Sequence, residues 1–158
     1  MRGDPFQIVR AGRPAGFRLL HQLLLEYEWD LAPELRHGAV PPLETVRSTY
    51  VAPNAAFVAL RDGGAAGCVA VRRLDPQTAV LARLFVRPPQ RGHGIARALV
   101  ARAVGFARRE RFERIVLDTD KEKLPAAYRL YLSEGFRACA PYETVDYGCP
   151  TYMQLRLV

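Results

Sequence analysis

The sequence is poor in lysine, cysteine and histidine. Only Lys121 and Lys123 are lysines among its 23 basic residues. Cys68, Cys139 and Cys149 form no Cys-x-x-Cys pair, and the three histidines do not fall at the spacing of metal ligands. We therefore expect no metal site and no disulfide framework, but three free thiols in a reducing compartment.

Long apolar runs are also missing. No stretch of about 18 or more apolar residues occurs, so we expect no membrane span and no membrane partner. The first residues, MRGDPFQIVRAG, contain no apolar stretch of the kind that a signal peptide requires. We therefore expect a cytoplasmic protein.

The composition is that of an ordinary globular chain with a basic balance. Hydrophobic residues make up 49% of the 158 residues and charged residues 25%, which predicts a single domain over residues 1–158. The formal net charge is +7, but the arginines are scattered along the chain rather than clustered. This pattern disfavours a dedicated nucleic-acid surface, whereas a small anionic ligand would need only a few of these arginines.

Hydrophobic periodicity and turn residues predict alternating strands and helices. The expected strands are 6–11, 55–60, 65–74, 78–87, 114–119, 136–142 and 151–158, and the expected helices are 16–29, 43–50, 92–109 and 124–133. The order indicates an α/β (α+β) fold with a mixed, largely antiparallel central sheet flanked by helices, entered through one βαβ unit.

The stretch RLFVRPPQRGHGIARALV, residues 83–100, joins an apolar strand to a helix. The first N–H groups of a helix lack intrahelical partners, and the helix dipole adds positive charge there. Gly92 and Gly94 have no Cβ to keep an anion away, and Arg91 offers a planar donor fork. The junction therefore predicts a phosphate or pyrophosphate site, with a purely steric tight turn as the alternative. Gly-Ile-Ala stands where a Walker A loop needs Gly-Lys-Ser/Thr, and a dinucleotide fingerprint would follow the first strand.

These residues resemble the acetyl-CoA signature of the GNAT N-acetyltransferase superfamily, which Arg91, Gly94 and Ala96 match. Downstream, LDT at 117–119 and AAYRLYLSEGF at 126–136 resemble the second conserved region of that family, and PYETVDYGCPTYMQL resembles its final hairpin. The resemblance covers the chain from about Thr78 onward, and before that only the order of elements agrees. It implies the GNAT acyl-CoA N-acyltransferase architecture, with acetyl-CoA as co-substrate.

The same resemblance implies how the coenzyme is bound. The pantetheine arm pairs with the backbone of the strand that contains Leu84, Phe85 and Val86, and that strand parts from 114–119 to make room. A backbone N–H near Phe85 or Val86 polarises the thioester carbonyl. The pyrophosphate lies on the loop amides of Arg91, Gly92, His93, Gly94, Ile95 and Ala96. We expect the His93 side chain to face solvent.

Tyr131 occupies the position of the family's general acid, which protonates the departing thiolate. A phenol with a pKa of ~10 gives its proton to a thiolate of ~8.5 at a cost of about 2 kcal/mol, so we expect a benefit of roughly a hundredfold. The alternative is a packing role, because Leu124, Tyr128, Tyr131 and Leu132 form an apolar helical stripe. We assign Tyr128 to packing.

The general base departs from the family pattern. An alkylamine with a pKa of ~10.4 is neutral in only about one molecule in 2,500 at pH 7, which adds about 4.6 kcal/mol to the barrier. The glutamate that many members carry on the long strand corresponds to Val80, and the asparagine at the start of the later helix is missing. The candidate substitutes are Glu26, Glu28, Asp30, Asp118, Glu143 and Asp146.

The implied activity is transfer of an acetyl group to a primary amine by direct attack, since no Cys or Ser has an evident His partner for a covalent route. The alternative is a non-catalytic acyl-CoA-binding or sensing module, which the missing glutamate favours and Tyr131 opposes. The acceptor, a small-molecule or peptide amine, is left open, and we expect residues 16–50 and the hairpin near 142–151 to select it. The resemblance also allows a homodimer.

Overall fold

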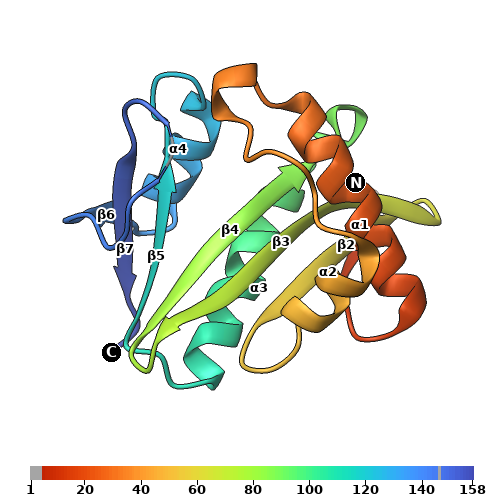
Figure 1. Ribbon diagram of the computed structural model, residues 1–158, viewed down its shortest axis with the longest axis horizontal. Helices are drawn as coiled ribbons and strands as arrows, with labels where there is room; N and C mark the ends of the chain where they lie inside the picture. The colour runs from red at the N-terminus through yellow and green to blue at the C-terminus, as the bar shows by residue number, and fades with distance from the viewer. Residues whose placement is uncertain (1–4, 146) are drawn as a thin grey trace.

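A twisted sheet of seven strands, in the order β1-β2-β3-β4-β5-β7-β6, forms the centre of the molecule, and helices lie on both of its faces (Figure 1). The computed structural model describes residues 5–145 and 147–158. The strands are β1 (Phe6–Arg10), β2 (Ala55–Arg61), β3 (Gly64–Asp75), β4 (Thr78–Val86), β5 (Arg114–Thr119), β6 (Arg137–Ala138) and β7 (Thr151–Arg156). All neighbouring strands are antiparallel except β4 and β5, which confirms the predicted mixed sheet.

Helices cover both faces of this sheet (Figure 1). They are α1 (Pro14–Asp30), α2 (Leu43–Thr49), α3 (Ile95–Arg109) and α4 (Pro125–Ser133), with short 3-10 turns η1 (Pro33–Leu35) and η2 (Pro88–Gln90). The predicted stripe of Ile95, Leu99, Ala103 and Phe106 is buried and packs α3 into a core that Tyr131 of α4 also joins. A second core lies under α1 and α2 on the opposite face.

Two predicted boundaries are wrong for local reasons. The helix expected from residue 92 begins at Ile95, because Gly92 and Gly94 adopt left-handed φ angles of 85° and 81° that a helix cannot include. The strand expected at 136–142 shrinks to Arg137–Ala138, and Pro141 further on has no N–H to donate to a ladder. The sequence RDGG predicts a hairpin around its two glycines. The β2–β3 hairpin forms, but its turn is centred on Asp62 and Gly63, with φ of 54° and 77°, a pair typical of a type I′ turn, and Gly64 already belongs to β3.

β4 departs from regular geometry in two ways that create space. Its parallel pairing with β5 is confined to Thr78–Val80 against Arg114–Val116, after which the two strands diverge, as Figure 1 shows. On its other side a bulge places Arg83 and Leu84 opposite a single residue of β3, and Arg83 has a left-handed φ of 59°. Such bulges bend a strand and re-aim its side chains.

Candidate active site

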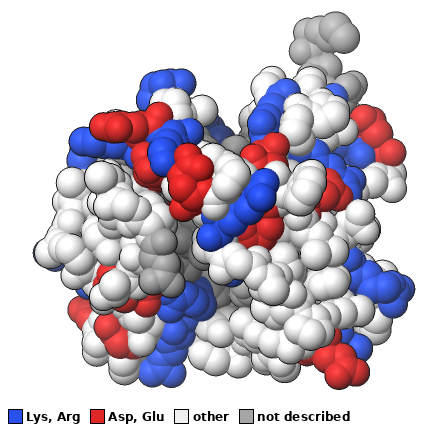
Figure 2. Space-filling view, turned by 45° about the horizontal axis from the view of Figure 1, so that its top comes forward, with Lys and Arg blue, Asp and Glu red and all other residues white. Residues whose placement is uncertain are grey.

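A cavity of about 590 Å³ lies where β4 and β5 part. Its walls are Leu81–Val86 of β4, Asp118 and Thr119 of β5, the start of α3, one face of α4 up to Tyr131 and the end of α1. Figure 2 shows that the molecule is hollowed on this side and that acidic and basic side chains intermingle around the hollow. Within the described residues, no group of three or more His, Cys, Asp or Glu side chains could hold a metal ion, and no helix is long and apolar enough to cross a membrane.

The residues predicted to bind coenzyme come together around this cavity. Leu84, Phe85, Val86, Arg91, Gly92, Gly94, Ile95 and Ala96 all line it. His93 does not line it and is exposed, as expected. Gly94 is the N-cap of α3 and provides no side-chain hydrogen bond, so the amides of the first turn are open to a ligand. A Cβ at Gly94 would meet no atom within 4 Å, which shows how much room the loop leaves.

The side chain of Arg91 fixes the loop to its neighbours. Its Nε donates to the Val86 carbonyl at 2.9 Å, and its Nη2 donates to Asp30 Oδ2 at 2.8 Å. The guanidinium thus ties the loop to the end of β4 and to the end of α1. These contacts engage Nε and Nη2 of Arg91 and leave Nη1 without a contact among the described residues, so a role of Arg91 as an anion donor stays a prediction.

Two tyrosines face the cavity from opposite elements, Tyr131 buried and Tyr27 partly buried. Tyr131 of α4 is 7% exposed, its ring centroid lies 5.9 Å from that of Phe136, and its hydroxyl makes no hydrogen bond within the described part of the chain. Burial raises the pKa of Tyr131 well above that of a free phenol, so its hydroxyl keeps its proton. Tyr27 of α1 lies 5.7 Å from the Phe85 ring, and burial raises its pKa to about 12.

Most of the candidate bases are already paired. Close ion pairs join Glu26 to Arg87, Asp30 to Arg91 and Glu143 to Arg72. Val80, at the position of the family glutamate, is buried where β4 still pairs with β5, before the strands part. Asp146 lies outside the described residues.

Asp118 has a different environment. It lies near the end of β5, lines the cavity, and accepts hydrogen bonds from the Tyr142 hydroxyl at 2.8 Å and the Tyr147 hydroxyl at 2.7 Å. Both tyrosines come from the β6–β7 connection, and burial, together with the hydrogen bond to Asp118 and its negative charge, raises their pKa values. Within the described residues, no cation forms an ion pair with Asp118.

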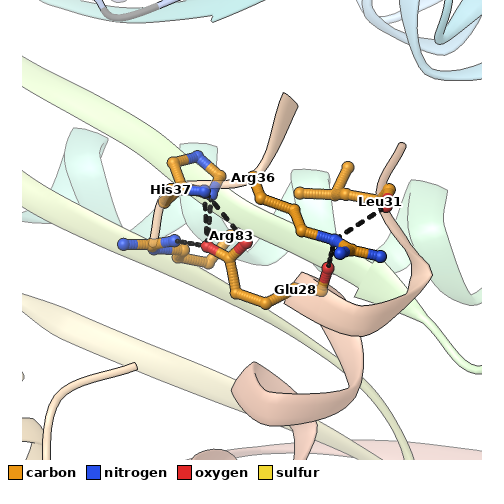
Figure 3. Close-up of polar contacts among 5 residues, drawn as sticks. All are labelled: Glu28, Leu31, Arg36, His37 and Arg83. Atoms are coloured by element: carbon orange, nitrogen blue, oxygen red, sulfur yellow. Dashed lines mark hydrogen bonds and ion pairs between the residues drawn. The ribbon is translucent and has the colours of Figure 1, made fainter. Parts of the chain in front are cut away.

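Glu28 belongs to a cluster that reasoning from the sequence missed. Its carboxylate accepts from the backbone N–H of His37 at 2.9 and 3.0 Å, lies 2.7 Å from His37 Nδ1, and lies 3.4 Å from Arg83 Nη1 (Figure 3). Arg36 donates to the Glu28 and Leu31 carbonyls at the end of α1. The sequence contained one signal for this cluster, because Arg83 is a charged residue inside the apolar run VLARLFV.

Comparison with known proteins agrees with this geometry. Residues 12–136 match the acetyltransferase (GNAT) family. An uncharacterized N-acetyltransferase of Schizosaccharomyces pombe is 35% identical over 142 residues, which cover 88% of this chain and 85% of that protein. The N-acetylaspartate synthetase of Danio rerio is 38% identical over 108 residues, covering 66% of this chain, which spans only 37% of that enzyme's length.

The fold has close structural counterparts. A putative acetyltransferase from Salmonella typhimurium, solved with its cofactor acetyl-CoA, superposes with a TM-score of 0.79 at 23% identity, over 97% of this chain and 94% of that one. This likeness confirms the predicted GNAT architecture. The sequence match over most of the chain goes further than the fold. The chain belongs to the acetyltransferase (GNAT) family and is an N-acetyltransferase that depends on acetyl-CoA.

Proposed function

We propose that the chain transfers the acetyl group of acetyl-CoA to the primary amine of a small molecule or peptide by direct attack, in the cavity between β4 and β5. The observation that carries the proposal is the meeting of three features in one cavity. These are a stretch of β4 beyond Val80 whose edge toward β5 has no partner strand among the described residues, the open amides at the start of α3, and the buried phenol of Tyr131.

The coenzyme is bound mainly by backbone groups. Beyond Val80 the edge of β4 that faces β5 has no strand partner, so the pantetheine arm can pair with Leu84, Phe85 and Val86 as an added strand. The pyrophosphate lies on the amides of the loop from Arg91 to Ala96, where the dipole of α3 favours negative charge. Arg91 keeps this loop fixed against β4 and α1.

The chemistry requires one bond to form and one to break. The amine lone pair forms a C–N bond to the thioester carbon, and a backbone N–H near Phe85 or Val86 stabilises the oxyanion. As the carbonyl re-forms, the C–S bond breaks and the thiolate takes the proton of Tyr131. A covalent acetyl-cysteine route is disfavoured, because Cys68 is fully buried, burial raises its pKa to about 12, and none of the three cysteines lines the cavity.

We assign the proton of the attacking amine to Asp118. The other described candidates are engaged by arginines or by His37, whereas Asp118 accepts only from two neutral phenols. Its negative charge draws a cationic amine to the site, where the ammonium first loses one proton to water and so becomes the neutral amine whose lone pair attacks. Asp118 then accepts the second proton, which the nitrogen loses once the C–N bond has formed.

The experiment is an acceptor screen that detects free thiol. The purified chain is incubated with acetyl-CoA and a panel of amines, which includes aspartate because relatives are named N-acetylaspartate synthetase, a polyamine, an aminoglycoside and short peptides. Thiol release that depends on one acceptor supports the proposal. Tight acetyl-CoA binding without release across the panel favours the sensing module instead, and absence of acetyl-CoA binding refutes both.

Three expectations from the sequence stay predictions of this proposal. We propose that the chain acts in the cytoplasm, without a nucleic-acid partner. We keep the homodimer that the family allows as a prediction for analytical ultracentrifugation of the purified chain.

A further inference from the structure

Arg83 is a charged residue within the strand that would carry the thioester. It lies in the β4 bulge, in a left-handed conformation that is unusual for a residue with a side chain. Its side chain is 27% exposed, and it lines both the main cavity and a second cavity of about 220 Å³. A strained residue that places a charge between two cavities indicates a functional position.

The guanidinium of Arg83 has unused donors. Its one contact with the described residues is Nη1 to Glu28 Oε1 at 3.4 Å, although a guanidinium has five N–H groups. By contrast, Arg87 contacts both oxygens of Glu26 at 2.7 Å, and Arg91 contacts Asp30 at 2.8 Å. Arg83 is therefore able to receive an anion without first losing a close partner.

Glu28 and His37 hold this arginine in place. Glu28 is 8% exposed, and the backbone and ring of His37 fix its carboxylate (Figure 3). The long contact to Glu28 orients the Arg83 fork while leaving its other donors open. Glu28 and His37 are thus positioning residues, and Arg83 is the group that would contact a ligand.

The second cavity limits the size of what Arg83 can bind. Leu24, Val40 and Val46 supply apolar walls, and Thr49, Tyr50 and His37 supply polar groups. Its volume is below the roughly 300–1,000 Å³ of pockets that hold drug-sized ligands. A short acidic side chain or a small carboxylate fits this description, and a long chain does not.

We infer that Arg83 binds a carboxylate of the acceptor, so that the acceptor is an amino acid or another small amine that also carries a carboxylate. The inference rests on the proposed transfer to an amine. Of the charged residues that line the main cavity, Arg83 on β4 has unused donors and Asp118 on β5 forms no ion pair among the described residues. This combination suits a zwitterion with its carboxylate toward Arg83 and its amine toward Asp118. A polyamine would place a second ammonium beside Arg83, where like charges repel.

Matched acceptors that differ only in a carboxylate test this inference. Thiol release from acetyl-CoA is measured for each amino acid and for its α-amide. For L-aspartate the set also includes L-asparagine, which is its side-chain amide, and putrescine serves as an acceptor without a carboxylate. We expect kcat/KM to fall about 10-fold to 100-fold when the recognised carboxylate becomes an amide, because a charge-assisted contact is lost. Equal or faster turnover of the amides or of putrescine overturns the inference and leaves the proposed transfer intact.

Variants identify the residue responsible. Arg83→Ala should raise KM for the preferred amino acid by about 10-fold to 100-fold, with kcat and the Kd of acetyl-CoA changed far less, and Arg83→Lys should recover part of the loss. Arg47→Ala, which removes an exposed arginine of α2 outside both cavities, is the matched control for charge. If Arg83→Ala raises KM equally for the amino acid and for its amide, the assignment of Arg83 as the carboxylate-binding residue is overturned.

Binding separates this inference from the proposed activity. L-aspartate and its two amides are titrated calorimetrically into the chain saturated with coenzyme A. Failure of every amine to release thiol refutes the transfer, whereas selective binding of a carboxylate that depends on Arg83 still supports the anion site. The inference is overturned if no acceptor binds in a way that depends on its carboxylate and turnover shows no preference for a carboxylate.

Discussion

Gly67 of β3 approaches the carbonyl oxygen of Phe85 in β4 so closely that a Cβ at Gly67 would lie 2.4 Å from that oxygen. Val86 Cα would be only 3.1 Å away, so backbone on the far strand must move to admit a side chain. We predict that Gly67→Ala lowers the free energy of unfolding by about 1–3 kcal/mol. It should also weaken acetyl-CoA binding, since the displaced residues are those proposed to pair with pantetheine. Urea unfolding and calorimetry measure the two effects.

The same strand offers a control for this substitution. Gly64 begins β3, and a Cβ there would meet no atom within 4 Å. Gly64→Ala should therefore leave both stability and acetyl-CoA affinity within the error of measurement. An equal loss in the two variants would show that β3 tolerates no added methyl group, and the link between Gly67 and the coenzyme would fail.

Gly94 tests the anion loop. Its φ of 81° makes any L side chain costly, by about 1–2 kcal/mol, although the space around it is open. We predict that Gly94→Glu abolishes detectable acetyl-CoA binding, because a carboxylate would occupy the site of the pyrophosphate. Gly63→Glu, at a φ of 77° in the β2–β3 turn, carries the same backbone cost and the same charge away from the loop. Similar coenzyme affinity in the two variants would remove the loop from the proposed site.

Local patterns predicted the parts of the fold that depend on neighbours in the sequence. The spacing of Ile95, Leu99, Ala103 and Phe106 marked the buried face of α3, and each of these residues is buried. The glycines of the loop marked a junction that lacks helix geometry, yet the first helical residue was misplaced. Periodicity locates an element better than it locates the residue at which an element begins.

Contacts between distant segments were beyond such patterns. Arg83 adopts a left-handed conformation that no turn residue announced, and its partner Glu28 lies 55 positions earlier in the chain. Asp118 was one of several equivalent acids in the sequence. Its selection depends on Tyr142 and Tyr147, which a later loop places against it. The proposed coenzyme site is largely local in sequence, whereas the proposed acceptor site is assembled from remote elements.

Tyr131→Phe tests the general acid. The variant removes one hydroxyl that makes no hydrogen bond within the described chain, so stability should change little. We predict that kcat falls by up to about a hundredfold while the Kd of acetyl-CoA stays within about twofold. Tyr128→Phe changes a packing tyrosine of α4 that does not line the cavity and should retain full activity. Unchanged kcat in Tyr131→Phe would remove this phenol from the mechanism.

Asp118→Asn tests the proton acceptor. The amide keeps the size of the side chain but cannot take a proton, so kcat should fall about 10²-fold to 10⁴-fold. Acetyl-CoA affinity should persist, because the proposed coenzyme site is formed by β4 and the loop. The comparison variant is Glu143→Gln, which changes another candidate for the general base that is already paired with Arg72. A larger loss in Glu143→Gln than in Asp118→Asn would reverse the assignment.

Tyr27 should make the free energy of unfolding fall at alkaline pH. Burial raises its pKa to about 12, whereas a phenol of the unfolded chain titrates near ~10. Between these values the folded chain keeps a proton that the unfolded chain loses, so the free energy of unfolding falls as pH rises, by at most about 1.4 kcal/mol per pH unit. The contribution is fully present below pH ~10. We predict that urea midpoints from pH 8 to 11 fall less steeply for Tyr27→Phe than for the parent chain. Tyr128→Phe is the comparison for loss of a phenol outside the cavity, and parallel curves for Tyr27→Phe and the parent would show that the Tyr27 hydroxyl reaches water.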